Sequence, residues 1–548
     1  MNQLRLFIIL FCFLYPGFSL YGQTIIGQVE VKEFDGGVND YPYEVGGYYG
    51  NLAYVMHQPA LRLSEGEFAH IWHPSKSGYR ERIVVKYNML LEEMWRVEFK
   101  LENEEDIVHA FSNDTAIVLL TNKYFYNDHS HRIFRRTISL DSGRVSTAQI
   151  IHQINGKNNQ ELMISEATDK KSILIYHYEL EKPKGRLRVL RDYLYTNETL
   201  GYRITGAEKM VFRHFDLDLN ELNQGEIWLN PIPKNKSSVF SCQLDPHSNI
   251  YVSIYDKPSV LRVIRYNCES KDQQSISYDD FPDYWYEQDP YMTHVPPVIG
   301  SSSRVYIGMA ERVKLRSVWQ TQSYTVVTLD FNTGLVDESR QVETNSTLLV
   351  KASKIRQAFG SKPAKTFDKY LIKDIIEMSN GHVWLMTQKY DYDYHSSGYA
   401  APNANYRISY KIEELIFYEF DQDGEFLRSL IVPSYQRTEE ESDYAGLFYS
   451  LNIDRESQEI NMLTHEMTGE KLTQPPRTFY RKIDLVTGTF TPRVQVFEGK
   501  RRIQNFFKYY TVWLNPTVAI LVVEDGSEGR TYLLSVDLLG EAEEHGEE

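Results

Sequence analysis

Cysteine is scarce in this sequence: there are three in 548 residues, and no two of them form a Cys-x-x-Cys pair. This excludes a disulfide-rich fold and a zinc module built on paired cysteines. Long apolar runs are also lacking, because no stretch after the first 22 residues reaches the about 18 apolar residues that a membrane-spanning helix needs. We therefore expect a chain that is not an integral membrane protein.

Positive charge is in deficit, since 59 Lys and Arg stand against 75 Asp and Glu, for a net charge of −16. The basic residues form neither a stripe nor an amphipathic helix. Nucleic-acid binding needs Lys and Arg to neutralise phosphates, so we expect no nucleic-acid partner.

The common catalytic motifs are absent as well. The sequence contains no Gly-x-Ser-x-Gly, no His-Glu-x-x-His, no phosphate-binding Gly-x-x-x-x-Gly-Lys loop and no Gly-x-Gly-x-x-Gly. This argues against the enzymes that carry those motifs but not against all enzymes. Nothing in the sequence predicts a cofactor.

Residues 1–22 have the pattern of a secretory signal peptide. One positive charge at Arg5 precedes nine apolar residues at 6–14, Pro16 ends the run, and Gly22 supplies a small residue for cleavage. Cys12 raises the alternative of a lipoprotein, but the residue before it is Phe11, not a small residue. We expect an exported protein with a single mature domain at 23–548, located in the periplasm, on the outer surface or outside the cell.

One pattern recurs along the mature chain: a polar turn followed by a short run rich in Val, Ile, Leu and aromatic residues. Successive copies begin 55 to 78 residues apart. The eight copies begin at Asn51, Thr115, Ser172, Asn249, Arg304, Gly381, Glu459 and Thr517. Such runs are typical of buried strands. Helical periodicity is rare, and its best example is short, at 351–359.

A second pattern is a strand that leads into Asp and then a Gly turn. Asp caps a tight turn through its side chain, and Gly adopts the positive φ that the turn needs. The clearest cases are Asp141 with Gly143, Asp330 with Gly334, Asp421 with Gly424 and Asp484 with Gly488. Repeated strands and turns of this kind predict an all-β fold: a single large β-propeller of seven or eight blades with long inserted loops. The partly alternating segment 24–31 can pair beside the strand that ends near Asp537 and so close the ring.

Two stretches resemble an uncharacterised group of secreted bacterial β-propeller-like proteins. The first is the phrase Tyr-Asn-x-x-Leu-x-x-x-Trp from Tyr87 to Trp95, and the second spans 415–424 and 431–436. The resemblance implies the fold and export. It implies no activity and no functional residues.

The most site-like stretch is 277–291, with four Tyr, one Trp, one Phe and five carboxylates. Aromatic faces can stack on sugar rings while carboxylates bind hydroxyl groups, so Tyr284, Trp285 and Tyr286 are candidate ligand-binding residues. Tyr392 and Tyr394 are candidates in a second Tyr-rich insertion. The alternative is that both stretches are loops that pack their aromatic residues on the propeller.

Three clusters carry side chains that bind metals. Alternate residues of a strand share a face, which would unite Asp391, Asp393 and His395 or, elsewhere, His129 and His131. The third cluster is Asp421 with Asp423. Polar loops and Asp-Gly turns explain all three without a ligand, and a zinc site needs three or four protein ligands. We therefore predict no metal site.

The cysteines left after removal of the leader, Cys242 and Cys268, lie near the first and third strands of one predicted repeat. Strands two spacings apart lie about 9–10 Å from one another. A disulfide needs Cα atoms within about 7 Å, so the pair is predicted to be unbridged unless the strand order differs.

These observations favour a binding or scaffold protein that contacts a protein or glycan ligand through Tyr-rich loops, with no catalysis expected. The alternative is a glycan-active or other extracellular hydrolase that uses carboxylates at the mouth of the propeller channel. The two differ in whether carboxylates from different repeats meet in a pocket with raised pKa values.

Overall fold

The computed structural model describes most of the chain from Thr24 onward. The described residues are 24–31, 60–64, 66–72, 81–103, 105–155, 162–180, 204–205, 207–229, 237–256, 260–281, 297–315, 318–358, 363, 366–367, 370–396, 406–438, 449–466, 477–496, 504–506, 511–525 and 530–538.

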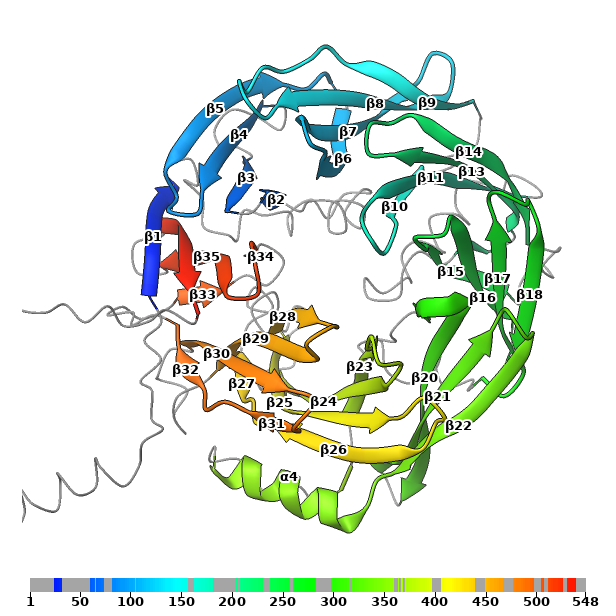
Figure 1. Ribbon diagram of the computed structural model, residues 1–548, viewed down its shortest axis with the longest axis vertical. Coiled ribbons are helices and arrows are strands. Elements are labelled where there is room, and N and C mark those ends of the chain that lie inside the picture. Colours follow the sequence, from blue (N-terminus) through cyan, green and yellow to red (C-terminus); the bar gives the residue numbers. More distant parts are fainter. Residues whose placement is uncertain are drawn as a thin grey trace, which may run out of the picture.

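Eight antiparallel sheets, arranged as the blades of a β-propeller, account for the strands among these residues (Figure 1). We number the blades in chain order. Blade 1 comprises β2 (Ala60–Ser64), β3 (Glu67–Trp72), β4 (Glu81–Asn88) and β5 (Glu93–Lys100). Blade 2 comprises β6 (Glu105–Ser112), β7 (Ala116–Phe125), β8 (Ser130–Ser139) and β9 (Gln149–Asn155). Blade 3 comprises β10 (Met163–Glu166), β11 (Ser172–Leu180), β13 (Ala207–Asp216) and β14 (Glu221–Trp228). Blade 4 comprises β12 (Ile204–Thr205), β15 (Ser237–Leu244), β16 (Asn249–Asp256), β17 (Val260–Asn267) and β18 (Gln273–Tyr278).

The second half of the ring repeats this arrangement, with the longest strands in blades 5 and 6. Blade 5 comprises β19 (Val298–Ile299), β20 (Arg304–Leu315), β21 (Val318–Asp330) and β22 (Leu335–Glu343). Blade 6 comprises β23 (Tyr370–Glu377), β24 (Val383–Ser396), β25 (Tyr406–Phe420), β26 (Phe426–Val432) and β27 (Gln436–Thr438). Blade 7 comprises β28 (Tyr449–Asp454), β29 (Glu459–Glu466), β30 (Arg477–Asp484), β31 (Thr489–Phe490) and β32 (Val494–Gln495). Blade 8 comprises β33 (Gln504–Phe506), β34 (Val512–Trp513), β35 (Val518–Asp525), β36 (Arg530–Asp537) and β1 (Thr24–Val31).

The repeated apolar runs are interior strands of these sheets. Seven of the eight predicted runs lie in described residues, and each has a hydrogen-bonded strand on both sides, in β7, β11, β16, β20, β24, β29 and β35. Their continuous apolar sequence reflects burial on both faces between neighbouring blades, as in β16, where only Asp256 is partly exposed. The outermost strand β5 instead alternates between exposed and partly exposed residues. The run that begins at Asn51 lies outside the described residues. In blade 1 the strand in the corresponding position, next to the innermost strand, is β3.

The ring closes by pairing the segment 24–31 with the last strand of the ring. Strand β1 lies antiparallel to β36, with Thr24 opposite Asp537 and Val31 opposite Thr531. The N-terminal strand therefore forms the outer edge of the last blade (Figure 1). The predicted closure is confirmed, and the blade count is eight.

The predicted Asp-Gly turns are also confirmed. Their glycines have positive φ, with +67° at Gly143, +74° at Gly334, +95° at Gly424 and +67° at Gly488. At the turn after β25, both amides of Asp423 and Glu425 donate to Oδ1 of Asp421 at 2.9 Å. Asp330 and Asp484 cap their turns in the same way, whereas in the turn after β8 the amide of Ser142 donates to Oγ of Ser139 and not to Asp141.

Cys242 and Cys268 are free and buried, as predicted. Cys242 lies in β15 and Cys268 follows β17, while β16 pairs with both of those strands and separates them. Burial raises the pKa of the Cys268 thiol to about 12 and that of Cys242 further, so both thiols are protonated and unreactive at neutral pH.

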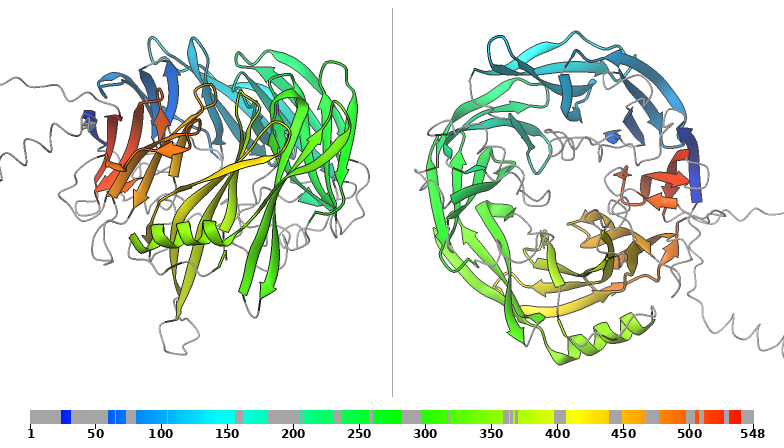
Figure 2. Two further views of the ribbon diagram at one scale, coloured as in Figure 1. Left: turned by 60° about the horizontal axis from the view of Figure 1, so that its bottom comes forward. Right: turned by 180° about the vertical axis from the view of Figure 1, so that it is seen from behind.

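Two features depart from this regular plan. The hairpins β20–β21 and β24–β25, from neighbouring blades, extend beyond the other blades on one side of the ring (Figure 2). Helix α4 (Ser346–Ala358) is inserted between β22 and β23 and lies outside the ring beside blade 6 (Figure 1). It begins before the predicted helical stretch, where the amide of Leu348 donates to Oδ1 of Asn345 at 2.9 Å. No helix in the described part of the chain has the length and apolar content to cross a membrane.

Candidate functional site

The hairpin β24–β25 carries two of the predicted site residues, and its base is an irregularity in the ladder. Gln388 pairs with Leu415, but the next regular pair joins Tyr390 to Ile412. One extra residue therefore lies in β25, so that Glu413 and Glu414 together stand opposite a single residue of β24. A β-bulge of this kind redirects the strands and fixes the direction in which a hairpin leaves its sheet.

Arg356 of α4 neutralises this bulge. Its Nε lies 3.0 Å from Oε1 and 3.2 Å from Oε2 of Glu414, and 3.5 Å from Oε2 of Glu413. Its Nη2 donates to the hydroxyl of Tyr370 at 2.8 Å, and that hydroxyl donates to Glu414. All four side chains are buried. The inserted helix is thus tied to the base of the hairpin by charge-assisted hydrogen bonds.

The neighbouring charges stabilise the protonated form of Arg356. Burial alone would lower the pKa of Arg356, but Glu414, with Tyr370 and Glu413, raises it above its usual value. Burial, followed by the charge of Glu414, raises the pKa of Tyr370 well above its usual value, so Tyr370 remains a neutral donor. Lys389 adds a second buried cation, with Nζ 5.6 Å from the Tyr370 ring centroid.

Beyond the bulge the two strands remain in regular register from Tyr390 to Ser396, where the sequence predicted an insertion between the strands. Tyr392 pairs with Tyr410 and Tyr394 with Ile408, which puts these four positions on one face of the hairpin. The other face has Asp391 opposite Lys411, Asp393 opposite Ser409 and His395 opposite Arg407. The Tyr and Asp positions of this segment thus alternate between the two faces of the hairpin. As predicted, the backbone places positions Asp391, Asp393 and His395 on the same face of the strand.

The other predicted ligand-binding residues, Tyr284, Trp285 and Tyr286, lie outside the described residues. Two aromatic residues of the same stretch are described and buried: Tyr278 at 5% and Phe281 at 0% exposure. The Phe281 ring lies 5.7 Å from that of Tyr255. At these two positions the aromatic residues pack into the propeller.

The His129 and His131 pair does not form the predicted strand face. His129 lies in the turn before β8, with φ +53°. Its Nδ1 lies 3.1 Å from the hydroxyl of Tyr124, and the ring of His131 lies 4.7 Å from the Tyr124 ring. Asp128 caps the turn through Ser130 and bonds Arg132. Within the residues that the structure describes, no group of three or more His, Cys, Asp or Glu could hold a metal ion.

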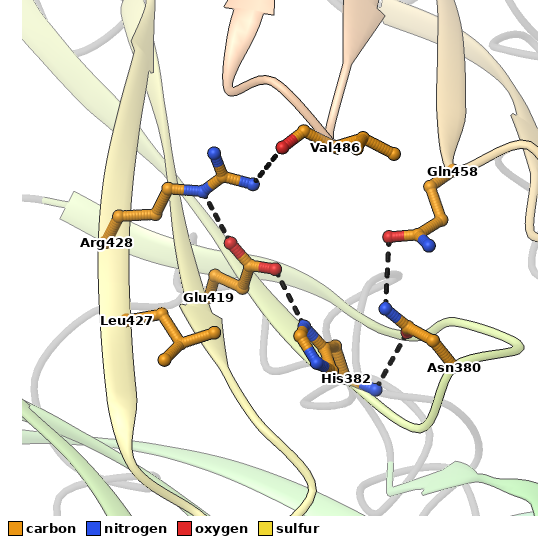
Figure 3. Close-up of a pocket in the computed structure, with 7 residues that line it drawn as sticks. All are labelled: Asn380, His382, Glu419, Leu427, Arg428, Gln458 and Val486. Atoms are coloured by element: carbon orange, nitrogen blue, oxygen red, sulfur yellow. Dashed lines mark hydrogen bonds and ion pairs between the residues drawn. The ribbon is translucent and has the colours of Figure 1, made fainter.

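A cleft of about 400 Å³ opens between blades 6 and 7, and sequence reasoning missed it (Figure 3). Its lining is Asn380, His382, Glu419, Leu427, Arg428, Gln458 and Val486. The buried carboxylate of Glu419 accepts hydrogen bonds on both oxygens, from Nδ1 of His382 at 2.8 Å and from Nε of Arg428 at 2.6 Å.

Arg428 also crosses to the neighbouring blade. Its Nη2 donates to the carbonyl of Val486 at 2.9 Å and to that of Leu485, at the turn between β30 and β31 (Figure 3). The cleft is thus bridged by a bond from an outer strand of one blade to the Asp-Gly turn of the next.

The same contact recurs around the ring. A residue of the third or the outermost strand of one blade donates to a carbonyl of the turn between the third and fourth strands of the following blade. The members are Trp95 to Leu140 at 2.7 Å, Arg135 to Asp218 at 3.0 Å and Arg340 to Gln422 at 2.8 Å. We call these contacts, with that of Arg428, the inter-blade latches. The Arg428 cluster is therefore first a structural element of the ring. The repeated Asp-Gly turns that accept these hydrogen bonds are visible in the sequence. The donor residues are not, because they lie about one repeat earlier in the chain.

The innermost strands carry one close pair of titratable side chains and two separate carboxyl groups with raised pKa among the described residues. His109 of β6 lies 2.9 Å from Glu166 of β10, a contact between blades 2 and 3. Burial alone would raise the pKa of Glu166, but the hydrogen bond from His109 lowers it. Burial raises the pKa of Asp374 in β23 to about 6 and also raises that of Asp106 in β6. Strands β6 and β23 lie on opposite sides of the ring (Figure 1), so these two carboxyl groups do not form a pair.

No protein-family model and no curated protein matches the sequence. Among solved structures, the chain is similar to the WD40 domain of SCAP from fission yeast, with 9% identity, TM-score 0.34, and 87% of this chain and 94% of that chain covered. It is also similar to the Nup133 β-propeller domain of Vanderwaltozyma polyspora, with 9% identity, TM-score 0.38, and 85% and 99% covered. A third is the polysaccharide lyase Uly1, with 14% identity, TM-score 0.33, and 93% and 99% covered.

Proposed function

We propose that this chain is an exported β-propeller that binds a protein or glycan ligand through the side of the ring from which the long hairpins project, without chemistry of its own. The observation that carries the proposal is the anchored hairpin β24–β25. Its two strands continue beyond the sheet, and Arg356, Glu413 and Glu414 tie its base to α4. A buried ion cluster at the base of a projecting hairpin holds the hairpin in a fixed direction.

Rigidity matters because binding costs entropy. A hairpin that is already ordered loses less conformational freedom on binding than a loop does, so more of its contact energy appears as affinity. Tyrosine supplies a large amphipathic surface with few rotatable bonds, which suits wet protein and glycan interfaces. Tyr392, Tyr394 and Tyr410 occupy positions on one face of this hairpin.

The hydrolase alternative needs two carboxyl groups about 5 to 10 Å apart on either side of a bond. The two described aspartates whose pKa is raised, Asp106 and Asp374, belong to strands on opposite sides of the ring. This separation favours binding over hydrolysis. The proposal also includes export, which rests on the signal-peptide pattern of residues 1–22.

The test is a binding screen of the mature chain on a glycan array and a peptide array. The variant Tyr392→Ala/Tyr394→Ala is screened beside the wild type. Loss of two interfacial tyrosines is expected to weaken a specific ligand about 30-fold or more, since single hot-spot residues contribute about 2 kcal/mol.

The matched control is Tyr126→Ala, which removes a 60% exposed tyrosine from the β7–β8 turn of blade 2. Ligands that bind the wild type and the control but not the double variant support the proposal. Ligands that bind all three proteins equally, or no ligand on either array, would contradict it.

A further inference from the structure

The cleft between blades 6 and 7 contains an imidazole that the inter-blade latch does not need. Arg428 closes the latch by itself, because its Nε donates to Glu419 at 2.6 Å and its Nη2 donates to two carbonyls of blade 7. His382 nevertheless places Nδ1 at 2.8 Å from the other carboxylate oxygen of Glu419 (Figure 3). The buried carboxylate thus holds the imidazole in one orientation in the wall of the cleft.

The same place in two other blades is occupied differently. Glu419 is the third-strand residue two positions before the Asp that caps the following turn, and a lysine holds this position in blades 1 and 7. Each lysine pairs with a glutamate at the start of the second strand, where blade 6 has His382. These ion pairs are Lys86 to Glu67 at 2.9 Å and Lys482 to Glu459 at 2.7 Å. Blade 6 therefore presents a ring nitrogen where the other two blades have a direct Lys–Glu pair.

Nε2 of His382 is a hydrogen-bond acceptor that this arrangement leaves available. A carboxylate only accepts hydrogen bonds, so Nδ1 carries the proton that is shared with Glu419. In the neutral imidazole the other nitrogen then has a lone pair. Within the described part of the chain Nε2 has no hydrogen-bond partner, and the His382 side chain is 25% exposed. The cleft therefore offers an acceptor whose position is fixed by a buried group.

Hydrogen-bond donors and two apolar side chains complete the lining. The amide of Gln458 is oriented by Asn380, whose Nδ2 donates to Oε1 of Gln458 at 3.2 Å, so that the Nε2 of Gln458 is left as a donor (Figure 3). Nη1 of Arg428 adds donors that the latch does not use. Leu427 and Val486 are 48% and 58% exposed and supply apolar surface.

The chemistry of this lining fits a neutral sugar. Arg428 and Glu419 carry opposite charges that cancel, so the lining favours neither an anion nor a cation. A sugar hydroxyl both donates and accepts, so neighbouring hydroxyls can donate to His382 and accept from Gln458 at the same time. The C–H groups of the sugar ring can pack on the two apolar side chains. A volume of about 400 Å³ lies within the range of small-ligand sites.

We propose that the cleft between blades 6 and 7 binds one neutral sugar residue, with Nε2 of His382 as acceptor and the amide of Gln458 as donor. This site goes beyond the proposed function, because it is separate from the Tyr-rich hairpin. His382 directly precedes β24 and Tyr392 lies ten residues along the chain, about 33 Å in an extended strand. The sugar is either free or the terminal residue of a glycan, and both sources share the hydroxyl groups that the cleft recognises.

The test is made in solution, because millimolar binding does not survive the washing of an array. Methyl glycosides of glucose, galactose, mannose and fucose, and the free sugars, are screened against the mature chain by saturation-transfer NMR. Calorimetry then gives the dissociation constants. At least one neutral sugar is expected to bind at about 1 mM, the affinity typical of about twelve non-hydrogen atoms. Binding of both forms supports the end of a glycan as the ligand, and binding of the free sugar alone supports a soluble sugar.

The variant His382→Asn separates ligand binding from the stability of the fold. The Nδ2 of asparagine replaces Nδ1 as the donor to Glu419, while the acceptor at Nε2 is lost. Binding should weaken about fivefold or more, with an unchanged melting temperature. Glu67→Gln changes the same position in blade 1 and should bind the sugar like the wild type. The variant Tyr392→Ala/Tyr394→Ala should do so as well.

A second variant, Gln458→Met, keeps much of the side-chain volume and removes the amide without touching Glu419. It should weaken binding about threefold or more. Sugar binding that is unchanged in both cleft variants would overturn the inference, as would the absence of binding by every neutral sugar. Glucuronate that binds about tenfold more tightly than the best neutral sugar would overturn the choice of a neutral ligand. These outcomes leave the proposed function intact, since it depends on ligands that the hairpin variant loses.

Discussion

Replacing Arg356 by Met tests whether the ion cluster at the hairpin base is what holds it. Methionine keeps much of the side-chain volume and has a similar helix propensity, so the main change is the lost charge. Arg356 is the cation hydrogen-bonded to Glu414, whose side chain is only 1% exposed and also accepts a hydrogen bond from Tyr370. Breaking a buried ion pair by removing one partner costs about 3–5 kcal/mol, because the other charge is left without compensation.

The expected change in melting temperature follows from the size of the chain. At about 2.1 cal/mol/K of unfolding entropy per residue, 548 residues correspond to about 1 °C per kcal/mol, so Arg356→Met should lower Tm by about 3–5 °C. Lys354→Met changes an exposed residue of the same helix and should alter stability by less than about 0.5 kcal/mol. Differential scanning calorimetry of both variants at pH 8 makes the comparison.

The pH dependence separates charge from packing. A buried carboxylate without a cation takes up a proton more readily in the folded state than in the unfolded state, so acid relieves the penalty. The Tm gap between wild type and Arg356→Met should therefore be largest at pH 8 and shrink toward pH 5. The double variant Arg356→Met/Glu414→Gln should recover part of the loss at pH 8. A Tm gap that is the same at pH 5 and pH 8 would refute the idea that the charge of Arg356 stabilises the hairpin base. So would an Arg356→Met variant with the same Tm as Lys354→Met.

Three further predictions concern the rest of the ring. Arg428→Met removes an inter-blade latch and the cation beside buried Glu419, and we expect it to lower the free energy of unfolding, measured with denaturant, by about 2–4 kcal/mol. The control Lys482→Met breaks the half-exposed ion pair with Glu459 and should lower it by at most about 1 kcal/mol. Equal losses in the two variants would contradict a stabilising role of the latch. Burial, then Arg213 and His177, lowers the pKa of His152 to about 4. The folded state therefore favours its neutral form, and its contribution is complete above about pH 6.5 and is lost as pH falls toward 4. At pH 5 protonation of His152 should have lowered the free energy of unfolding of the wild type by about 2 kcal/mol. In His152→Gln the free energy of unfolding should therefore fall less steeply as the pH is lowered. An unchanged pH dependence would contradict this role of His152. Cys242 and Cys268 should be unreactive to a thiol reagent in the native protein and both react after denaturation without reductant; two missing thiols would reveal a bridge.

The sequence predicts the ring well because the ring is made of locally encoded pieces. Interior strands such as β7 and β16 are buried on both faces, and their continuous apolar runs are visible without any knowledge of partners. The Asp-Gly turns are equally local, since a cap and a positive φ act within five residues. Closure by β1 followed from the need to protect an open edge.

The anchored hairpin was less accessible to prediction. Tyr-rich sequence after Met386 was interpreted as an insertion, yet alternation of Tyr and Asp is also compatible with a strand, and β24 continues to Ser396. The ion pair that holds it joins residues 58 apart, one of them on an inserted helix. Sequence spacing carries no signal for such a pair, because any of many arginines would satisfy two adjacent glutamates. The partners of the inter-blade latches are hidden for the same reason.

The position of the anchor has a consequence for binding. Buried acidic residues elsewhere in the ring are neutralised within their own blade, as Glu105 is by Arg136 and Glu466 is by Arg481. For Glu414 of blade 6 the hydrogen-bonded cation comes instead from α4, so the docking of the helix and the direction of the hairpin share one ion cluster. A ligand that bends the hairpin changes the distance between Arg356 and Glu414, and the energetic cost of that change falls on α4. Ligand binding at the hairpin should therefore alter the hydrogen exchange of the backbone amides of α4. The amides around the Glu105–Arg136 ion pair of blade 2 should be unaffected.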